Sequence, residues 1–245
     1  MPHIRAEARR AFTMVELVIV VSIIAILAGL ALPRFQAARS AANESSAIAS
    51  LRALLAAEAI VQSHGDIDSN GDGVGESAFF GELTGTAGVR ESVGGVPALG
   101  VTRLTPTALT ASFGEVNASG LVAHSGYYFQ IWLPGTPGGG VIPGVAELPN
   151  VGGADPANMP DADACEYLWC CYAWPIAVGT SGSRAFFVNQ RGDVLQFLNT
   201  TATPYTGTSM MPGFDEAFVT AGDLSSDARV GVAGGNDGTT WLPVQ

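Results

Sequence analysis

Residues Arg9–Phe35 have the sequence RRAFTMVELVIVVSIIAILAGLALPRF, and the architecture of this chain follows from them. Within its apolar run, Val15–Leu32, only Glu16 and Ser22 carry polar side chains. At about 1.5 Å of rise per residue, a helix over Phe12–Leu32 spans roughly 30 Å, the thickness of the hydrocarbon core of a bilayer. The arginines before the run predict an N-terminus in the cytoplasm and a remainder outside it. The sequence therefore predicts a chain that enters a membrane at least once.

The composition of the 245 residues narrows the classes of function. Charged residues make up only 13%, which is about half the usual share for a soluble domain. All 11 basic residues are arginine, and against 22 acidic residues the net charge is −11. Nucleic acid is excluded as a partner, because binding it without sequence preference needs a basic face. A basic N-terminus followed by an acidic body is typical of an exported protein.

Two ordinary export signals compete for the N-terminal segment. A cleaved secretory signal also has a basic start and an apolar run, but this run is long and holds a carboxylate near its start. A plain signal anchor accounts for the length of the run but not for Glu16. An acid inside a membrane segment costs about 2.5–3.5 kcal/mol on insertion scales.

The hexapeptide Phe12-Thr13-Met14-Val15-Glu16-Leu17, between basic residues and an apolar run that ends at Pro33, resembles the class III signal of type IV pilins and type II secretion pseudopilins. The resemblance implies that a prepilin peptidase removes residues 1–11 and N-methylates Phe12. It implies that the apolar run is kept, first as the membrane anchor and then as the filament core. Glu16 and Pro33 match the acid and the proline of the family. The residue before the cut is usually Gly; here it is Ala11, so we expect slower processing.

A physical reason for Glu16 follows from this resemblance. Cleavage creates a positive amine on Phe12, four residues from the carboxylate, and pairing two charges in a low dielectric offsets much of their desolvation cost. In the family this pairing is thought to form between neighbouring subunits, where it sets the register of assembly. The alternative is an interfacial acid whose side chain reaches water.

The chain beyond the membrane run predicts an α+β fold, in which a long N-terminal helix packs on an antiparallel β-sheet head. Residues 34–63 are Ala-rich without Gly or Pro, so the helix should continue to about Ser63. An apolar stripe of Ile48, Leu51, Leu55 and Ala59, widened by Leu54, should face the head. Gly29 and Pro33 predict a kink or a melted turn. We expect a leader over 1–11, a transmembrane half over 12–33, an amphipathic half over 34–63 and an extracytoplasmic β-rich head over 64–245.

The head has four clear strand signals, rich in aromatic and branched residues. They are Tyr127–Leu133, Tyr167–Trp174, Arg184–Asn189 and Val194–Leu198. The last two are joined at hairpin spacing, which favours an antiparallel sheet. Residues 134–160 and 200–212 have the composition of Gly/Pro/Thr loops.

The stretch DIDSNGDGVGE, residues 66–76, resembles a calcium loop. Its first six positions match the D-x-D-x-N-G of an EF-hand, whose alternating oxygens wrap a hard cation. The last acid stands one position early, so the loop would close differently. The predicted ligands are Asp66, Asp68, Asn70, Asp72 and Glu76, with the Val74 carbonyl as a further oxygen. The alternative is an Asp/Asn/Gly turn held by bonds from side chains to the backbone.

Three cysteines lie in one seven-residue window. Cys170 and Cys171 should point to opposite faces of a strand, so at most one of them meets Cys165. A Cys165–Cys171 disulfide is one prediction outside the cytoplasm, and buried free thiols are the other. Zinc is not expected, because no second Cys/His pair stands at ligand spacing.

Motifs of known enzyme classes are missing from the sequence, so no catalytic residue is predicted. The resemblance implies a structural subunit of a type IV pilus-like filament, most simply a type II secretion pseudopilin. Its partners would be prepilin peptidase and other pilin or pseudopilin subunits. It would cross the bacterial inner membrane once, with its head in the periplasm or on a surface filament. The alternative is an exported calcium-binding domain or enzyme on an ordinary signal peptide or anchor.

Overall fold

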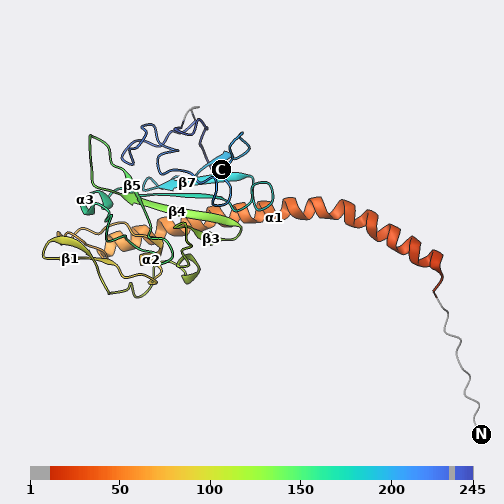
Figure 1. The fold of residues 1–245 in the computed structure, drawn as a ribbon, viewed down its shortest axis with the longest axis horizontal. Coiled ribbons are helices and arrows are strands. Elements are labelled where there is room, and N and C mark those ends of the chain that lie inside the picture. Colours follow the sequence, from red (N-terminus) through yellow and green to blue (C-terminus); the bar gives the residue numbers. More distant parts are fainter. Residues whose placement is uncertain (1–11, 232–234, 245) are drawn as a thin grey trace, which may run out of the picture. The chain divides into compact units, whose positions relative to one another are not determined.

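The computed structural model describes residues 12–231 and 235–244 (Figure 1). The chain divides into two compact units, Met1–Arg39 and Ser40–Gln245. Ala11, the predicted residue before the cleavage site, lies outside the described residues.

Helix α1, Met14–His64, begins in the first unit and ends in the second. Its start is a capping box, in which the Thr13 amide and hydroxyl both donate to Glu16 Oε2 at 3.0 Å, and the Glu16 amide donates to Thr13 Oγ1 at 3.2 Å. The helix continues through Gly29 and Pro33. The predicted melted turn is therefore wrong. The missing N–H of Pro33 removes a single backbone hydrogen bond, and the hydrogen bonds of the neighbouring residues maintain the helix.

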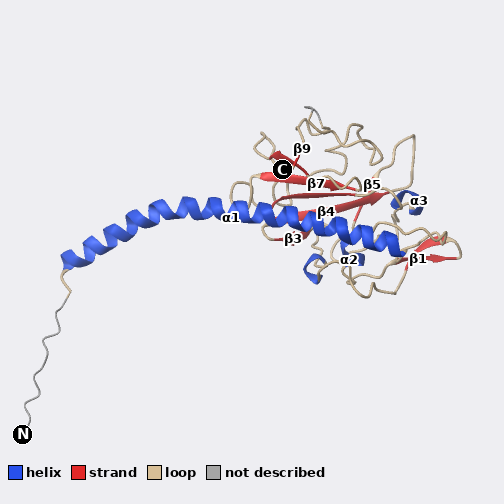
Figure 2. Cartoon of the chain, turned by 180° about the vertical axis from the view of Figure 1, so that it is seen from behind, coloured by secondary structure: helices blue, strands red, loops and turns tan. Residues whose placement is uncertain are grey.

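The second unit buries one face of α1 against the sheet (Figure 2). The buried residues recur three and four positions apart, as a helix face requires. They are Ala47, Ser50, Leu51, Leu54, Ala57, Glu58 and Val61. The predicted stripe was only partly right: Leu51 and Leu54 are buried, whereas Ile48 and Leu55 are half-buried and Ala59 is exposed. The buried face is thus rotated toward Glu58, a charged residue outside the predicted apolar stripe.

The head contains a seven-stranded antiparallel sheet in the order β3-β4-β6-β7-β8-β9, with β5 paired to β4. Its strands are β3 Val122–His124, β4 Tyr127–Pro134, β5 Gly144–Ala146, β6 Cys170–Pro175, β7 Arg184–Asn189, β8 Leu195–Leu198 and β9 Leu242–Pro243. A separate hairpin pairs β1 Arg90–Val93 with β2 Val96–Leu99. The described part of the head also contains three single-turn helices: α2 Phe80–Leu83, the 3₁₀ turn η1 Ala111–Phe113 and α3 Ala162–Cys165.

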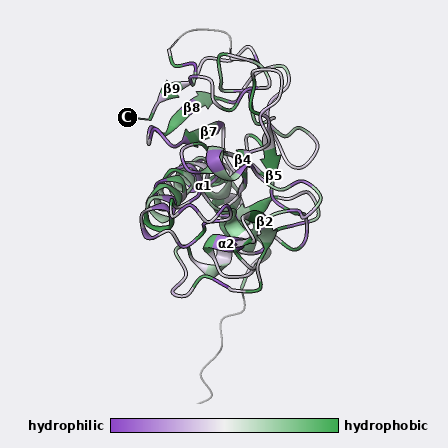
Figure 3. Ribbon diagram, turned by 90° about the vertical axis from the view of Figure 1, so that its left-hand side faces the viewer, coloured by the Kyte–Doolittle hydropathy of each residue, from purple (hydrophilic) through white to green (hydrophobic). Residues whose placement is uncertain are grey.

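Both faces of the large sheet are covered by hydrophobic cores, and its strands are largely apolar (Figure 3). Strand β6 shows the alternation: Cys171 and Ala173 belong to the core against α1, whereas Tyr172 and Trp174 belong to the second core. The second core is closed by residues that follow β8, including Phe218 and Trp241. A sheet covered on both faces explains why its central strands are apolar at nearly every position.

The α+β fold is confirmed, as are the four predicted strands. Strand β6 begins at Cys170, not Tyr167, because the preceding residues follow the turn of α3. Strands β1, β2, β3, β5 and β9 were not predicted. Strand β5 lies inside the stretch 134–160 that was expected to be loop, because the Trp132–Pro134 end of β4 offers an edge on which three residues can pair.

Candidate functional site

The N-terminal part of α1 exposes its apolar side chains on all sides. Glu16 itself is exposed and held in the first helical turn by Thr13, while Phe12 is 79% exposed. From Met14 to Phe35, fourteen large apolar residues are exposed, and by length and composition this stretch can cross a membrane. Water is a poor solvent for such a surface, so it must be covered by lipid or by other chains. Pro33 is exposed on the same segment.

The acidic loop after α1 is a turn held by its own side chains. Asp68 Oδ1 accepts from the amides of Gly71 at 2.7 Å and Asp72 at 3.1 Å, and its Oδ2 accepts from Gly73 at 3.0 Å. Asp72 Oδ1 accepts from the Val74 amide at 2.8 Å. Gly71 has a φ of 81°, a conformation that other residues rarely adopt.

Glu76 lies in the core of the head, where it contacts Ser69 of this loop and also Arg90. It is fully buried and forms an ion pair with Arg90, whose Nη1 lies 2.9 Å from Glu76 Oε2. Its Oε1 accepts from the Ser69 hydroxyl at 2.7 Å. The predicted five-ligand group is therefore not gathered as expected. Glu76 belongs to the core, because a buried guanidinium there needs carboxylate partners.

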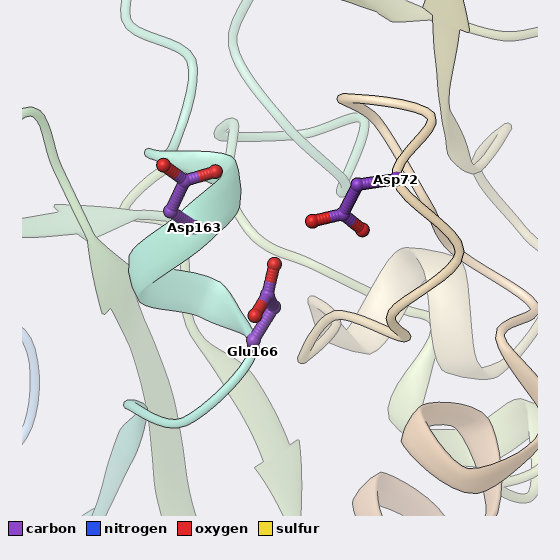
Figure 4. A group of neighbouring side chains, drawn as sticks. All are labelled: Asp72, Asp163 and Glu166. Carbon is purple, nitrogen blue, oxygen red and sulfur yellow. The ribbon is translucent and has the colours of Figure 1, made fainter.

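The structure instead brings Asp72 to two acids that are distant in sequence (Figure 4). Ligand oxygens of Asp72, Asp163 and Glu166 all lie within 4.8 Å of one another. Asn70 joins the group, because its Nδ2 donates to Asp163 Oδ1 at 2.8 Å. Desolvation, together with the charges of Asp72 and Asp163, raises the pKa of Glu166. The group contains two predicted ligands, Asn70 and Asp72, and two residues of the α3 region that no local motif indicated.

Arg90 at the start of β1 organises the interior of the head. It is 1% exposed, its Nε lies 3.0 Å from Glu82 Oε1, and its Nη2 donates to the Ser77 carbonyl. The Arg90 guanidinium thus pairs with two buried carboxylates, those of Glu76 and Glu82. No local pattern in the sequence indicates this network, because its members come from three separate segments.

In the structure the three cysteines are buried free thiols. Cys170 and Cys171 lie in different cores, as neighbours on a strand should. Cys165 shares a core with Cys171, but the disulfide predicted between them is not formed. Cys165 lies instead 3.5 Å from Arg90 Nη1, and burial raises its pKa to about 12, so this thiol stays protonated.

Comparison with known families agrees with the N-terminal geometry. The prokaryotic N-terminal methylation motif matches residues 8–32. This is the class III signal of type IV pilins and pseudopilins, and the chain carries it together with the pilin-like α+β architecture described above. None of the curated proteins and solved structures with which the chain was compared matches it.

Proposed function

We propose that this chain is a structural subunit of a type IV pilus-like filament, and more narrowly a pseudopilin of a type II secretion-like system. The observation that carries the proposal is the methylation motif at residues 8–32, which stands at the start of a helix whose apolar surface is exposed. The role is structural: the chain would act by assembly and would perform no catalysis.

The proposed cycle begins with cleavage between Ala11 and Phe12 by prepilin peptidase on the cytoplasmic side of the inner membrane. The new amine of Phe12 would lie at the positive end of the α1 dipole, near the Glu16 carboxylate. Glu16 stabilises its own helix end through Thr13, yet its side chain is exposed and can meet the amine of a neighbouring subunit. Its charge would then be matched only in the correct register of assembly.

The apolar half of α1 would anchor the chain in the inner membrane as a single span, with the head outside the cytoplasm. During assembly, neighbouring α1 helices would replace lipid around the same exposed residues. Because lipid and apolar helices solvate these side chains equally well, charge pairing and helix packing must supply the preference for the filament.

The assembly experiment is co-expression with a prepilin peptidase and the assembly machinery, followed by shearing and high-speed sedimentation. The proposed function predicts the processed chain in the sedimented filament fraction. In a host without the peptidase, the chain should stay in the membrane fraction at its full mass. A processed chain that remains monomeric in the presence of the complete machinery would contradict the proposal. Failure of exoprotein secretion after deletion would support the narrower role in type II secretion.

We also propose calcium as a cofactor of the loop after α1, held by a revised set of oxygens. The carboxylates of Asp72, Asp163 and Glu166 are oxygen donors of the kind that this hard cation takes, and the Asn70 side-chain nitrogen donates to Asp163 beside them. A cation would relieve the repulsion among the three carboxylates and would link the loop to α3. It would thereby fix the position of the loop that connects α1 to the head. Asp66 and Asp68 would support the loop and not bind the ion directly.

Calcium at 10 mM is expected to stabilise the chain by about 1–3 kcal/mol, as for a site of extracellular affinity. The measurement is urea unfolding in detergent, with EDTA and with equal magnesium as references. Asp72→Asn and Asp163→Asn should each remove most of the gain. Asp193→Asn, in the exposed turn between β7 and β8, is the matched control and should keep it. Equal stabilisation of all four proteins, or none of the wild type, would contradict this assignment.

A further inference from the structure

Three buried glutamates from different parts of the chain bind the backbone of one short segment. The Ala78 amide donates to Glu58 Oε2 at 3.0 Å, and the Phe79 amide donates to Glu82 Oε2 at 2.8 Å. The Gly81 amide donates to Glu147 Oε1 at 2.6 Å. Glu58 lies on α1, Glu82 on α2, and Glu147 just after β5. Segment 78–81 is therefore held in the head by carboxyl groups.

Within the described part of the chain, one of these three glutamates, Glu82, forms an ion pair. Arg90 pairs with Glu82 and with Glu76, which already gives two carboxylates for one guanidinium. Among the described residues, Glu58 and Glu147 form no ion pair, although each is 1% exposed. A buried carboxylate without a counter-ion costs several kcal/mol, so such a group takes up a proton instead.

The hydrogen bonds indicate where each proton would sit. Glu58 Oε1 and Glu147 Oε2 have no hydrogen-bond partner within the described part of the chain, whereas the other oxygen of each carboxyl accepts backbone amides. An oxygen that accepts N–H bonds acts as the carbonyl of a carboxylic acid, and the free oxygen then carries the hydroxyl proton. Each carboxyl thus has the pattern of a neutral acid.

Water is kept away from Glu147 by a close backbone contact. Its Oε1 also accepts from the Gly153 amide at 2.8 Å, and Gly153 lies directly against Gly81. A Cβ built on Gly81 would stand 2.8 Å from the Gly153 nitrogen, so no side chain fits there. Gly152 and Gly153 have φ values of 79° and 75°, which allow this loop to close over Gly81.

We infer that Glu58 and Glu147 are neutral carboxylic acids in the folded protein, and that an alkaline medium opens the contacts of segment 78–81 by removing their protons. The negative charge produced on each would have no cation to meet, because Arg90 is already bound. Segment 78–81 would then separate from α1 and from the 147–153 loop. This separation would let water reach both carboxylates. The device is independent of the proposed function, since it depends only on residues of the second unit, Ser40–Gln245.

The charged groups around the two acids agree with this inference. Desolvation raises the pKa of Glu58 to about 8, against smaller lowering effects of the Ala78 amide and Arg90. Desolvation likewise raises the pKa of Glu147 to about 8, although the Gly153 and Gly81 amides lower it. The nearby charge of Glu82 on α2 raises both values. Cys171 on β6 also faces both acids, and burial raises the pKa of its thiol, so it adds no charge near pH 8.

The sign of the pH effect follows from these values. In the unfolded chain both carboxyls ionise near pH 4.5, so between pH 4.5 and about 8 the folded chain binds more protons. Stability must therefore fall as the pH rises through this window. Each group can raise the unfolding constant by up to about tenfold per pH unit, and the two together by up to about a hundredfold.

The test is urea unfolding of the full chain in detergent at pH 5 to 8, followed by tryptophan fluorescence. All four tryptophans lie in the head. Glu58→Gln and Glu147→Gln keep the accepting oxygen and cannot ionise. Each substitution should remove a factor of about ten per pH unit from the rise of the unfolding constant with pH. The double variant should remove both factors. Glu115→Gln, at an exposed position, is the matched control and should keep the wild-type slope. The upper limit of pH 8 lies below the usual cysteine pKa of about 8.5 and so keeps most thiols of the unfolded chain protonated.

A second measurement tests the protonation of Glu58 and Glu147 even if the variants fail to fold. Infrared spectroscopy of the unmodified chain should show protonated carboxyl groups at pH 7 that exchange slowly in heavy water, and these should disappear above about pH 9 with increased amide exchange in segment 78–81. Full ionisation of all glutamates at pH 7 would overturn the inference. So would variants whose unfolding has the same pH slope as the wild type.

Discussion

Glu16→Gln is expected to abolish filament assembly while leaving cleavage, methylation and membrane insertion intact. Glutamine keeps an oxygen that can accept from the Thr13 amide, so the helix cap survives and only the charge is lost. In the filament the methylated amine of a neighbouring Phe12 would then be buried without a counter-ion. Breaking a buried ion pair in this way costs about 3–5 kcal/mol, which corresponds to at least a hundredfold loss of assembled subunits.

The measurement is the ratio of processed chain in the sedimented filament fraction to that in the membrane fraction. Ser22→Ala, which changes the other polar residue of the apolar run, is the control and should assemble normally. The Ser22 hydroxyl donates to the Val18 carbonyl of its own helix at 2.7 Å, so we assign it no contact with a neighbouring subunit. Glu16→Gln filaments at the wild-type level would refute the assigned role of the carboxylate.

Arg90→Met is expected to destabilise the head by about 3–5 kcal/mol, because it leaves Glu76 and Glu82 as uncompensated buried charges. Methionine fills much of the same volume, so the loss reflects charge more than a cavity. All three side chains are fully buried in the ion pairs, so solvent screens them little. Urea unfolding at pH 7, followed by the tryptophans of the head, measures the difference in the free energy of unfolding.

Arg191→Met is the matched control for this prediction. Arg191 pairs with Asp227, but both side chains are more than half exposed. An exposed pair contributes about 0–1 kcal/mol, so this variant should unfold almost as the wild type does. Adding Glu76→Gln and Glu82→Gln to Arg90→Met should recover part of the lost stability. Equal effects of the two arginine substitutions would show that the buried ion pairs contribute no more to the free energy of unfolding than the exposed pair does.

The parts of the molecule that sequence analysis predicted are those encoded by contiguous residues. The signal around Phe12 and Glu16 is a short motif beside an apolar run, and the matched methylation motif covers the same stretch. The strands Tyr127–Pro134 and Arg184–Asn189 are apolar runs long enough to be recognised singly. Strands such as β5 and β9 have two or three residues, and they exist only because a neighbouring edge pairs with them.

The candidate sites in the head depend on residues that the fold brings together from afar. Asp72 and Asp163 are 91 positions apart in the sequence, and nothing near either residue indicates the other. Glu76 looked like the last ligand of a loop, yet its partner Arg90 stands on a strand that was not predicted. Glu58 has the helical position of a polar surface residue, but the Ala78 amide that it binds comes from the far side of the loop. Tertiary contacts of this kind override local patterns.

The central claim is that the mature chain keeps its apolar helix and starts at a methylated Phe12. Mass spectrometry of the N-terminal peptide, from protein co-expressed with a prepilin peptidase, tests it most directly. We expect a peptide that begins with N-methyl-Phe12 and continues into the apolar run, with residues 1–11 removed. A mature N-terminus beyond the apolar run, near Pro33, would contradict it and would indicate an exported domain released by an ordinary signal peptide.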